Sequence, residues 1–461
     1  MQFACPPSHF AGFPPQNALG RPAPDRLHLQ TMNPVVLSLA FSAAVLASLL
    51  VKFWLATRQM RHVAAHRGAV PPAFAGTVPL EAHQKAADYT LAKLRLGIVN
   101  DAFGSAVLIC WTLLGGLNWL NGVLLEHIAP RWGAMPYQLL LVGAFVFVGA
   151  LLDLPFGLYS TFRLEQRFSF NKMTPSLYVA DLVKSTLLGI AIGGPLLALV
   201  LWIMQATGAA WWLWAWGALT TFQLLAMVVY PTLIAPLFNK FEPLSDDALV
   251  TRVQALMQRC GFRAKGFFVM DGSRRSAHAN AYFTGMGASK RVVFFDTLLK
   301  RLSGDEVEAV LAHELGHFAH RHIAKRVVMM LAFSLAGFAL LGWLAGQWGF
   351  YAGLGVTPNL AVTNNALALL LFMMGLPPFM FFVSPLFASL SRRDEYQADA
   401  YARDNANAAD LVRALLKLYE DNASTLTPDP LYVRFYYSHP PASSRIAALG
   451  LSGANLAGAA A

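Results

Sequence analysis

The sequence is poor in charged residues and in cysteine, and both shortages narrow the class of protein it can be. Only 13% of its 461 residues are charged, against about one quarter in an average soluble domain. The 3 cysteines, Cys5, Cys110 and Cys260, are too few and too scattered for a disulfide framework or a cysteine-based metal site. The net charge of +10 does not indicate nucleic-acid binding, because basic residues in so apolar a chain usually mark cytoplasmic loops.

Hydrophobic residues, which make up 56% of the chain, gather in long runs instead. Seven runs have roughly the 20 residues that a helix needs to cross a bilayer. They cover residues 34–56, 102–125, 138–157, 184–204, 211–238, 327–348 and 366–388. Lys and Arg concentrate in the first, third and fifth connections and in the C-terminal tail. This alternation predicts a multi-pass membrane protein with those connections and the C-terminus in the cytoplasm.

The runs also divide the chain into parts. We expect a flexible N-terminal extension, five spans, a cytoplasmic subdomain, two further spans and a C-terminal segment. These parts correspond to residues 1–31, 32–238, 239–326, 327–388 and 389–461. The extension has no long apolar core and does not resemble a signal peptide.

The cytoplasmic subdomain contains the motif HELGH on a predicted helix. Ser303 and Glu306 have the spacing of a capping box, which predicts the start of that helix. His313 and His317 are four residues apart and therefore share one helical face. Two imidazoles on one face can bind one zinc ion, and Glu314 is placed to act on a water molecule there. The alternative is a polar, histidine-rich helix face near the membrane surface.

A catalytic zinc takes three protein ligands and keeps one position open. The strongest candidate for the third is Glu395, in SRRDEYQADAYA after the last apolar run. Asp399, four residues later, could accept a hydrogen bond from a ligand histidine. An ordinary charged helix remains the alternative for this segment. Upstream, the strand-forming residues of 280–284 and 291–296 predict two neighbouring strands.

As a whole, the sequence resembles the integral-membrane type I CAAX prenyl endopeptidases. The resemblance covers about residues 34 to 450, and its motifs occur in the family's order. They include RFSFNKMTPSLYVADLVKS, PTLIAPLFNKFEPL, DGSRRSAHANAYFTGMGASKRVVFFDTLL, LAHELGHF, SRRDEYQADAYA and DPLYVRFYYSHPP.

The resemblance implies a fold and an activity beyond what the residues alone indicate. It implies an all-α multi-pass protein with seven transmembrane helices around a large chamber, and a small α+β zinc protease subdomain at the cytoplasmic face. It implies one Zn²⁺ per chain, held by His313, His317 and Glu395, with Asp399 supporting a ligand. The implied substrate is a peptide or protein with a prenylated C-terminus.

The same resemblance assigns roles around the metal. Glu314 would be the general base, taking a proton from water and passing it to the departing amine. His439 and Arg445, in SHPPASSR, match residues lining the family's active site, and either would stabilise the oxyanion. Asn280 and Ala281 match the strand that holds the substrate backbone.

Two other functions are compatible with the motifs. A site-2-type intramembrane protease also uses HExxH, but inside a span, whereas charged residues flank the motif here. A non-catalytic, zinc-stabilised scaffold or quality-control protein would close its metal with a fourth protein ligand. The partners expected are a peptide substrate and the lipid bilayer, with no nucleic acid. The compact loops favour a bacterial inner membrane, or the endoplasmic reticulum in a eukaryote.

Overall fold

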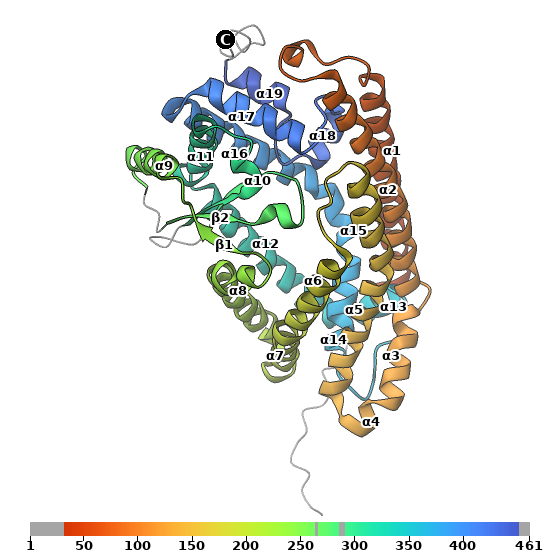
Figure 1. The fold of residues 1–461 in the computed structure, drawn as a ribbon. Helices are drawn as coiled ribbons and strands as arrows, with labels where there is room; N and C mark the ends of the chain where they lie inside the picture. The colour runs from red at the N-terminus through yellow and green to blue at the C-terminus, as the bar shows by residue number, and fades with distance from the viewer. Residues whose placement is uncertain (1–31, 263–265, 285–290, 451–461) are drawn as a thin grey trace, which may run out of the picture.

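A computed structural model describes residues 32–262, 266–284 and 291–450, and the predicted extension 1–31 lies outside them. In this part of the chain, seven helices are long and apolar enough to cross a membrane. They are Pro34–Ala65, Leu80–Trp111, Ala134–Glu165, Pro175–Ala206, Gly208–Leu237, His322–Ala345 and Asn365–Asn405. The expected seven-span architecture is therefore confirmed, and Figure 1 shows the small sheet at one end of the helices.

Several spans are built from shorter helical pieces. The helices of the membrane part are α1 (Pro34–Ala65), α2 (Leu80–Trp111), α3 (Gly116–His127), α4 (Ala129–Trp132), α5 (Ala134–Tyr159), α6 (Pro175–Leu188), α7 (Gly194–Ala206), α8 (Trp211–Val229), α12 (His322–Ala345), α13 (Trp348–Gly353), α14 (Asn365–Gly375), α15 (Pro377–Met380) and α16 (Ser384–Asn405). The 32 residues of α1 and of α2 give each helix a length of about 48 Å. Both helices therefore extend beyond a hydrocarbon core of about 30 Å.

The prediction for the second span, 102–125, is wrong. The span is α2, which begins 22 residues earlier at Leu80 and ends at Trp111. The chain then turns through Gly115, whose φ of 77° suits glycine. The apolar run continues across this turn into the separate helix α3, so hydropathy alone merged parts of two helices.

An apolar cavity of about 1310 Å³ lies among the membrane helices. Its wall is formed mainly by apolar side chains of α12, α14 and α16, including Phe333, Phe372 and Phe387. Only 6% of the apolar window of α12 is buried within the protein. The spans therefore enclose space between them instead of packing into a solid bundle.

A network of buried polar side chains lies at the opposite end of the spans from the sheet. Tyr137 donates a hydrogen bond to Asn121, and Asn121 donates to Asn359 at 2.9 Å. Asn359 in turn donates to the hydroxyl of Tyr137 at 3.0 Å. Because all three side chains are at least 92% buried, these bonds satisfy polar groups that would otherwise destabilise the fold. The network attaches α3 and α5 to the loop before α14.

The sheet and seven helices form a module beside the spans. Its helices are α9 (Asp247–Arg259), α10 (Asp296–Leu299), α11 (Gly304–Ala319), α17 (Ala408–Asp421), α18 (Pro430–Tyr436) and α19 (Ala442–Ala448), together with the end of α16. Its strands are β1 (Phe241–Pro243), β2 (Gly266–Met270), β3 (Ala281–Thr284) and β4 (Arg291–Phe295), in the order β1-β2-β4-β3. The β2–β4 pair is parallel and the other two pairs are antiparallel. The two predicted strands are confirmed as neighbours, and β3 is an edge strand.

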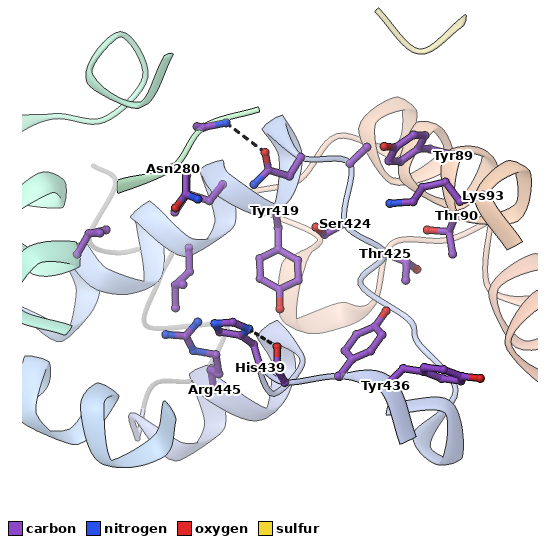
Figure 2. Close-up of a pocket in the computed structure, with 18 of the residues that line it drawn as sticks. Tyr89, Thr90, Lys93, Asn280, Tyr419, Ser424, Thr425, Tyr436, His439 and Arg445 are labelled. Atoms are coloured by element: carbon purple, nitrogen blue, oxygen red, sulfur yellow. Dashed lines mark hydrogen bonds between the residues drawn. The ribbon is translucent and has the colours of Figure 1, made fainter. Parts of the chain in front are cut away.

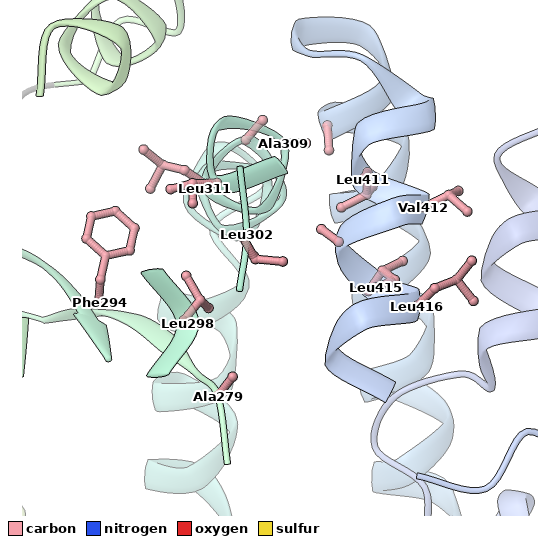
Figure 3. Close-up of a cluster of buried hydrophobic side chains, with 14 of the residues drawn as sticks. Ala279, Phe294, Leu298, Leu302, Ala309, Leu311, Leu411, Val412, Leu415 and Leu416 are labelled. Atoms are coloured by element: carbon pink, nitrogen blue, oxygen red, sulfur yellow. The ribbon is translucent and has the colours of Figure 1, made fainter. Parts of the chain in front are cut away.

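A hydrophobic core fixes α11 between the sheet and α17 (Figure 3). Leu311 of α11, Phe294 of β4 and Leu411 of α17 are each 1% exposed and belong to one buried cluster. The capping box predicted at Ser303 and Glu306 is present at the start of α11. The helix that carries the HExxH motif is thus held from both sides.

Candidate metal centre

Three donor side chains converge where α11 meets α16. His313 and His317 lie one turn apart on α11, and Glu395 comes from α16. The Nε2 atom of His313 is 3.4 Å from Glu395 Oε2, and that of His317 is 3.5 Å from Glu395 Oε1. One ligand atom from each residue lies within 4.8 Å of the others. The structure therefore brings together the three residues expected to bind a metal.

The chemistry of this group fits a zinc ion. Two imidazole nitrogens and one carboxylate oxygen are a common zinc donor set. The Oε2 atom of Glu395 is buried and has no hydrogen-bond partner among the described residues, which is costly for an isolated carboxylate. Burial lowers the pKa of His317 to about 4, so its imidazole is neutral at pH 7 and can offer a lone pair. Each of these features suits a bound cation.

A close approach of the two helices makes the convergence possible. Gly316 of α11 faces α16, and a Cβ atom built there would lie 2.8 Å from Ala398 Cα and 3.0 Å from Ala398 O. Only a residue without a side chain allows this contact. Because Gly316 immediately precedes His317, the same contact also fixes the position of His317 relative to Glu395.

Asp399 orients the first histidine, as its spacing from Glu395 suggested. It accepts a hydrogen bond from His313 Nδ1 at 2.8 Å, which leaves His313 Nε2 free to bind a metal. Arg445 donates to both oxygens of Asp399, at 2.8 and 2.6 Å, and is 95% buried. Arg445 therefore lies behind His313 and holds its carboxylate partner.

The sequence did not indicate the corresponding partner of the second histidine. His322, at the start of α12, is fully buried, and its Nδ1 atom is 3.0 Å from His317 Nδ1. Its Nε2 atom is 2.8 Å from the side-chain oxygen of Gln397. His322 is therefore a buried partner of His317 and does not belong to the exposed, histidine-rich helix face that the sequence left open as an alternative. In the sequence, only its spacing of five residues from His317 pointed to this contact.

Glu314 and His439 face the metal centre from different elements. Glu314 follows His313 on α11, and burial raises the pKa of its carboxyl. His439, in the loop after α18, places its Nε2 atom 3.4 Å from Glu395 Oε1. Its side chain is 62% exposed, so a substrate can reach it. Both residues line the cavity beside the metal centre.

That cavity has a volume of about 640 Å³ and contains every predicted site residue that is expected to touch substrate. Figure 2 shows His439 and Arg445 on one side and Asn280 above them. The carbonyl of Asn280 accepts a hydrogen bond from Phe295 of β4. The C=O of Asn280 and the N–H of Ala281 belong to one trans peptide group and point in opposite directions, so the N–H of Ala281 points to the free edge. There it donates to the side chain of Asn280 at 2.8 Å.

Comparison with known proteins agrees with this arrangement. The model described as CAAX prenyl protease N-terminal, five membrane helices, matches residues 59–240, and peptidase family M48 matches residues 243–451. The chain is 36% identical to CAAX prenyl protease 1 of Saccharomyces cerevisiae, over 82% of this chain and 88% of that protein. It is 30% identical to the human CAAX prenyl protease 1 homolog, over 89% and 95% of the two chains.

A solved structure shares the whole architecture. The crystal structure of S. mikatae Ste24p superposes with a TM-score of 0.83 at 33% identity, covering 90% of this chain and 99% of that one. Both halves of the chain and its three-dimensional fold thus indicate the same family. The chain belongs to peptidase family M48, as a multi-pass membrane metallopeptidase of the CAAX prenyl protease type.

Proposed function

We propose that this chain is a zinc endopeptidase in which His313, His317 and Glu395 hold one Zn²⁺ ion. The observation that carries the proposal is the convergence of these donors with a buried oxygen of Glu395 that has no hydrogen-bond partner in the described part of the chain. A bound zinc supplies Lewis acidity and makes water acidic enough to ionise near neutral pH. The remaining chemistry belongs to side chains that line the adjoining cavity.

Glu314 is the general base in this proposal. Its partly buried carboxyl, with a raised pKa, takes a proton from the attacking water and delivers it to the amine of the broken peptide bond. His439 is close enough to the ligand set to donate to the developing oxyanion. Arg445 is a positioning residue, because it donates to both oxygens of Asp399, the carboxylate that orients His313.

The free edge of β3 is the proposed binding site for the substrate backbone. An extended peptide can add to such an edge through main-chain hydrogen bonds. The N–H of Ala281 is available there once the side chain of Asn280 turns away. Asn280 and Ala281 are therefore the proposed substrate contacts.

We propose a prenylated C-terminal peptide as the substrate, in line with the names of the relatives. The apolar cavity among α12, α14 and α16 supports this choice, since Tyr436 and Ser438 line both it and the catalytic cavity. An isoprenyl chain would bury its apolar surface there. Cleavage of one peptide sequence with and without the prenyl group measures this preference, and equal kcat/KM values would contradict it.

We propose that the active site faces the cytoplasm, with the membrane being the endoplasmic reticulum or a bacterial inner membrane. The basic connections support this orientation. The HExxH helix α11 is not one of the seven candidate spans, which disfavours a site-2-type protease. A structural zinc usually has four protein ligands, whereas the donor group within the described residues has three members. This number disfavours the non-catalytic, zinc-stabilised scaffold.

Replacement of Glu314 by glutamine tests the catalytic proposal. The variant should bind about one zinc per chain, because none of the ligands has changed. Its kcat should fall by about 10²- to 10⁴-fold, the usual contribution of a general base. The metal content of the purified protein and the cleavage rate of a fluorogenic peptide measure the two effects.

Glu308→Gln is the matched control on the same helix. Glu308 forms ion pairs with Arg252 and Arg259 and does not line the catalytic cavity. Its variant should cleave at close to the wild-type rate. Wild-type activity in Glu314→Gln with zinc bound would remove Glu314 from the mechanism.

A further inference from the structure

The catalytic cavity extends away from the metal centre to a second end, formed by α1, α2 and the loop after α17. Residues of all three segments line this end, including Gln59, Lys93 and Ser424. Figure 2 shows Lys93 beside Tyr89 and Thr90, on the side of the cavity opposite His439 and Arg445. A bound peptide that reaches the metal centre therefore has room to continue towards Lys93.

Lys93 gives this end a positive charge. Among the described residues that line the cavity, it is the one charged side chain outside the metal centre. The structure gives its ammonium group no carboxylate within ion-pair distance in the described part of the chain. Its contact is with the ring of Tyr89, whose centroid is 5.0 Å from Nζ. Lys93 is exposed and lies on the charged N-terminal half of α2, so its ammonium group is accessible to a ligand in the cavity.

The surrounding structure fixes the ring that the exposed side chain of Lys93 contacts. The hydroxyl of Tyr89 donates to Glu165 at 2.6 Å, so the ring against which Lys93 rests is itself fixed. The ion pairs Lys52–Asp101 and Arg67–Asp88 show the antiparallel register of α1 and α2. That register puts Gln59 of α1 opposite the turn of α2 that holds Lys93.

Neutral donors accompany the cation. The side chain of Gln59 is 99% buried, and its Nε2 atom has no hydrogen-bond partner within the described residues. Thr425 accepts a hydrogen bond from the N–H of Thr427, which leaves its hydroxyl proton free to be donated. An ammonium group with amide and hydroxyl donors around it is complementary to a carboxylate, whose two oxygens accept several hydrogen bonds.

We infer that this end of the cavity binds the free C-terminal carboxylate of the substrate, with Lys93 as its counter-ion. The inference rests on the proposed peptidase function and deepens it. Lys93 and the metal centre lie at two ends of one cavity. A carboxylate bound to Lys93 would therefore set how many residues separate the cleaved bond from the chain terminus. Because each extended residue spans roughly 3.3–3.6 Å, a carboxylate bound there would favour cleavage at a constant number of residues from the chain terminus.

Two peptides that differ only at the C-terminus test this inference. One has a free carboxylate and the other a C-terminal amide, on the same prenylated fluorogenic sequence. We expect wild-type enzyme to cleave the acid with a kcat/KM about tenfold higher, mostly through KM, as for one charge-assisted hydrogen bond. Lys93→Met should bring the acid down to about the value of the amide. Lys93→Arg should restore most of the preference.

Lys85→Met is the matched control for these variants. Lys85 lies on the same helix and rests over the ring of Phe170, 4.8 Å from its centroid, but it does not line the cavity. Its variant should keep the full preference for the acid. Equal cleavage of acid and amide by wild-type enzyme, or an equal loss of both in Lys93→Met, would overturn the inference.

A third peptide, amidated but with aspartate as its last residue, separates the two sources of a carboxylate. If it is cleaved as well as the acid, an acidic side chain is the ligand and the C-terminal assignment is wrong. Fluorescence anisotropy of the same peptides with Glu314→Gln measures binding without turnover. Tighter binding of the acid that depends on Lys93 would uphold the carboxylate site even if no peptide were cleaved, which would refute only the peptidase function.

Discussion

At the scale of single residues, hydrogen bonds behind the metal centre decide which nitrogen each histidine offers. The side-chain oxygen of Gln397 can only accept, so His322 Nε2 carries a proton. In neutral His322, the Nδ1 atom then accepts a hydrogen bond from His317 Nδ1. This leaves the Nε2 lone pair of His317 directed towards Glu395. Asp399 does the same for His313.

Replacement of His322 by alanine should therefore weaken metal binding without removing a ligand. Loss of such a supporting hydrogen bond typically costs about 10- to 100-fold in metal affinity. Competition with a zinc chelator measures the affinity of the purified variant. The neighbouring His320 is exposed and stacks on His322 with ring centroids 5.5 Å apart, so His320→Ala is the control. If both variants bind zinc as tightly as wild type, His322 does not orient His317.

At the scale of elements, the contact between α11 and α16 is the part of the fold on which the metal centre depends most directly. Helix propensity favours alanine over glycine by up to about 1 kcal/mol. At Gly316, however, the added methyl group would meet backbone atoms of Ala398 at 2.8 and 3.0 Å. Backbone in the middle of a packed helix cannot move aside easily, and overpacking typically costs about 1–3 kcal/mol. Steric repulsion should outweigh propensity here.

Gly316→Ala should thus lower the thermal unfolding temperature and also weaken zinc binding, because the displaced helices separate His317 from Glu395. Gly304→Ala, at the first position of the same helix, is the control. A Cβ there would meet Arg252 at 3.6 Å, an ordinary van der Waals distance. Unfolding in detergent, followed with and without added zinc, compares the two variants. A Gly316→Ala protein as stable as wild type would show that the helices can separate without cost.

At the scale of the whole molecule, a few ion pairs join the protease module to the membrane helices. Arg275, just before the β3 strand, donates to both oxygens of Asp181 in α6 at 2.9 and 3.1 Å. It also donates to Asn239 at 2.9 Å, at the end of the fifth span. The side chains of Arg275 and Asp181 are only 18% and 15% exposed. Such shielding makes this pair stronger than a typical surface ion pair.

Arg275→Met should destabilise the protein by about 1–3 kcal/mol, between the values for exposed and for buried pairs. It should also raise the KM for peptide, since the segment after Arg275 leads directly to Asn280. Arg274→Met is the control at the adjacent, exposed position. The double variant Arg275→Met with Asp181→Leu should recover part of the lost stability. If the double variant is no more stable than Arg275→Met, the Arg275–Asp181 pair contributes little, and other contacts join the protease module to the membrane helices.

Much of the fold and the site followed from local patterns in the sequence. The apolar runs predicted seven spans, and the capping box at Ser303 predicted the start of α11, because both depend only on neighbouring residues. The two histidines of HExxH share a face for the same reason. The second span was misplaced because hydropathy does not register the reversal of the chain at Gly115.

By itself, therefore, the sequence determined which segments cross the membrane and which residue types can hold a metal, since both are properties of short stretches. Only the tertiary structure decided which side chains meet. Glu395 reaches His313 because Gly316 lets two helices approach closely, and His322 supports His317 because the chain turns between α11 and α12. Lys93 and Gln59 line one end of the catalytic cavity because α1 and α2 pack side by side. Contacts between distant segments depend on packing, which local sequence patterns do not encode.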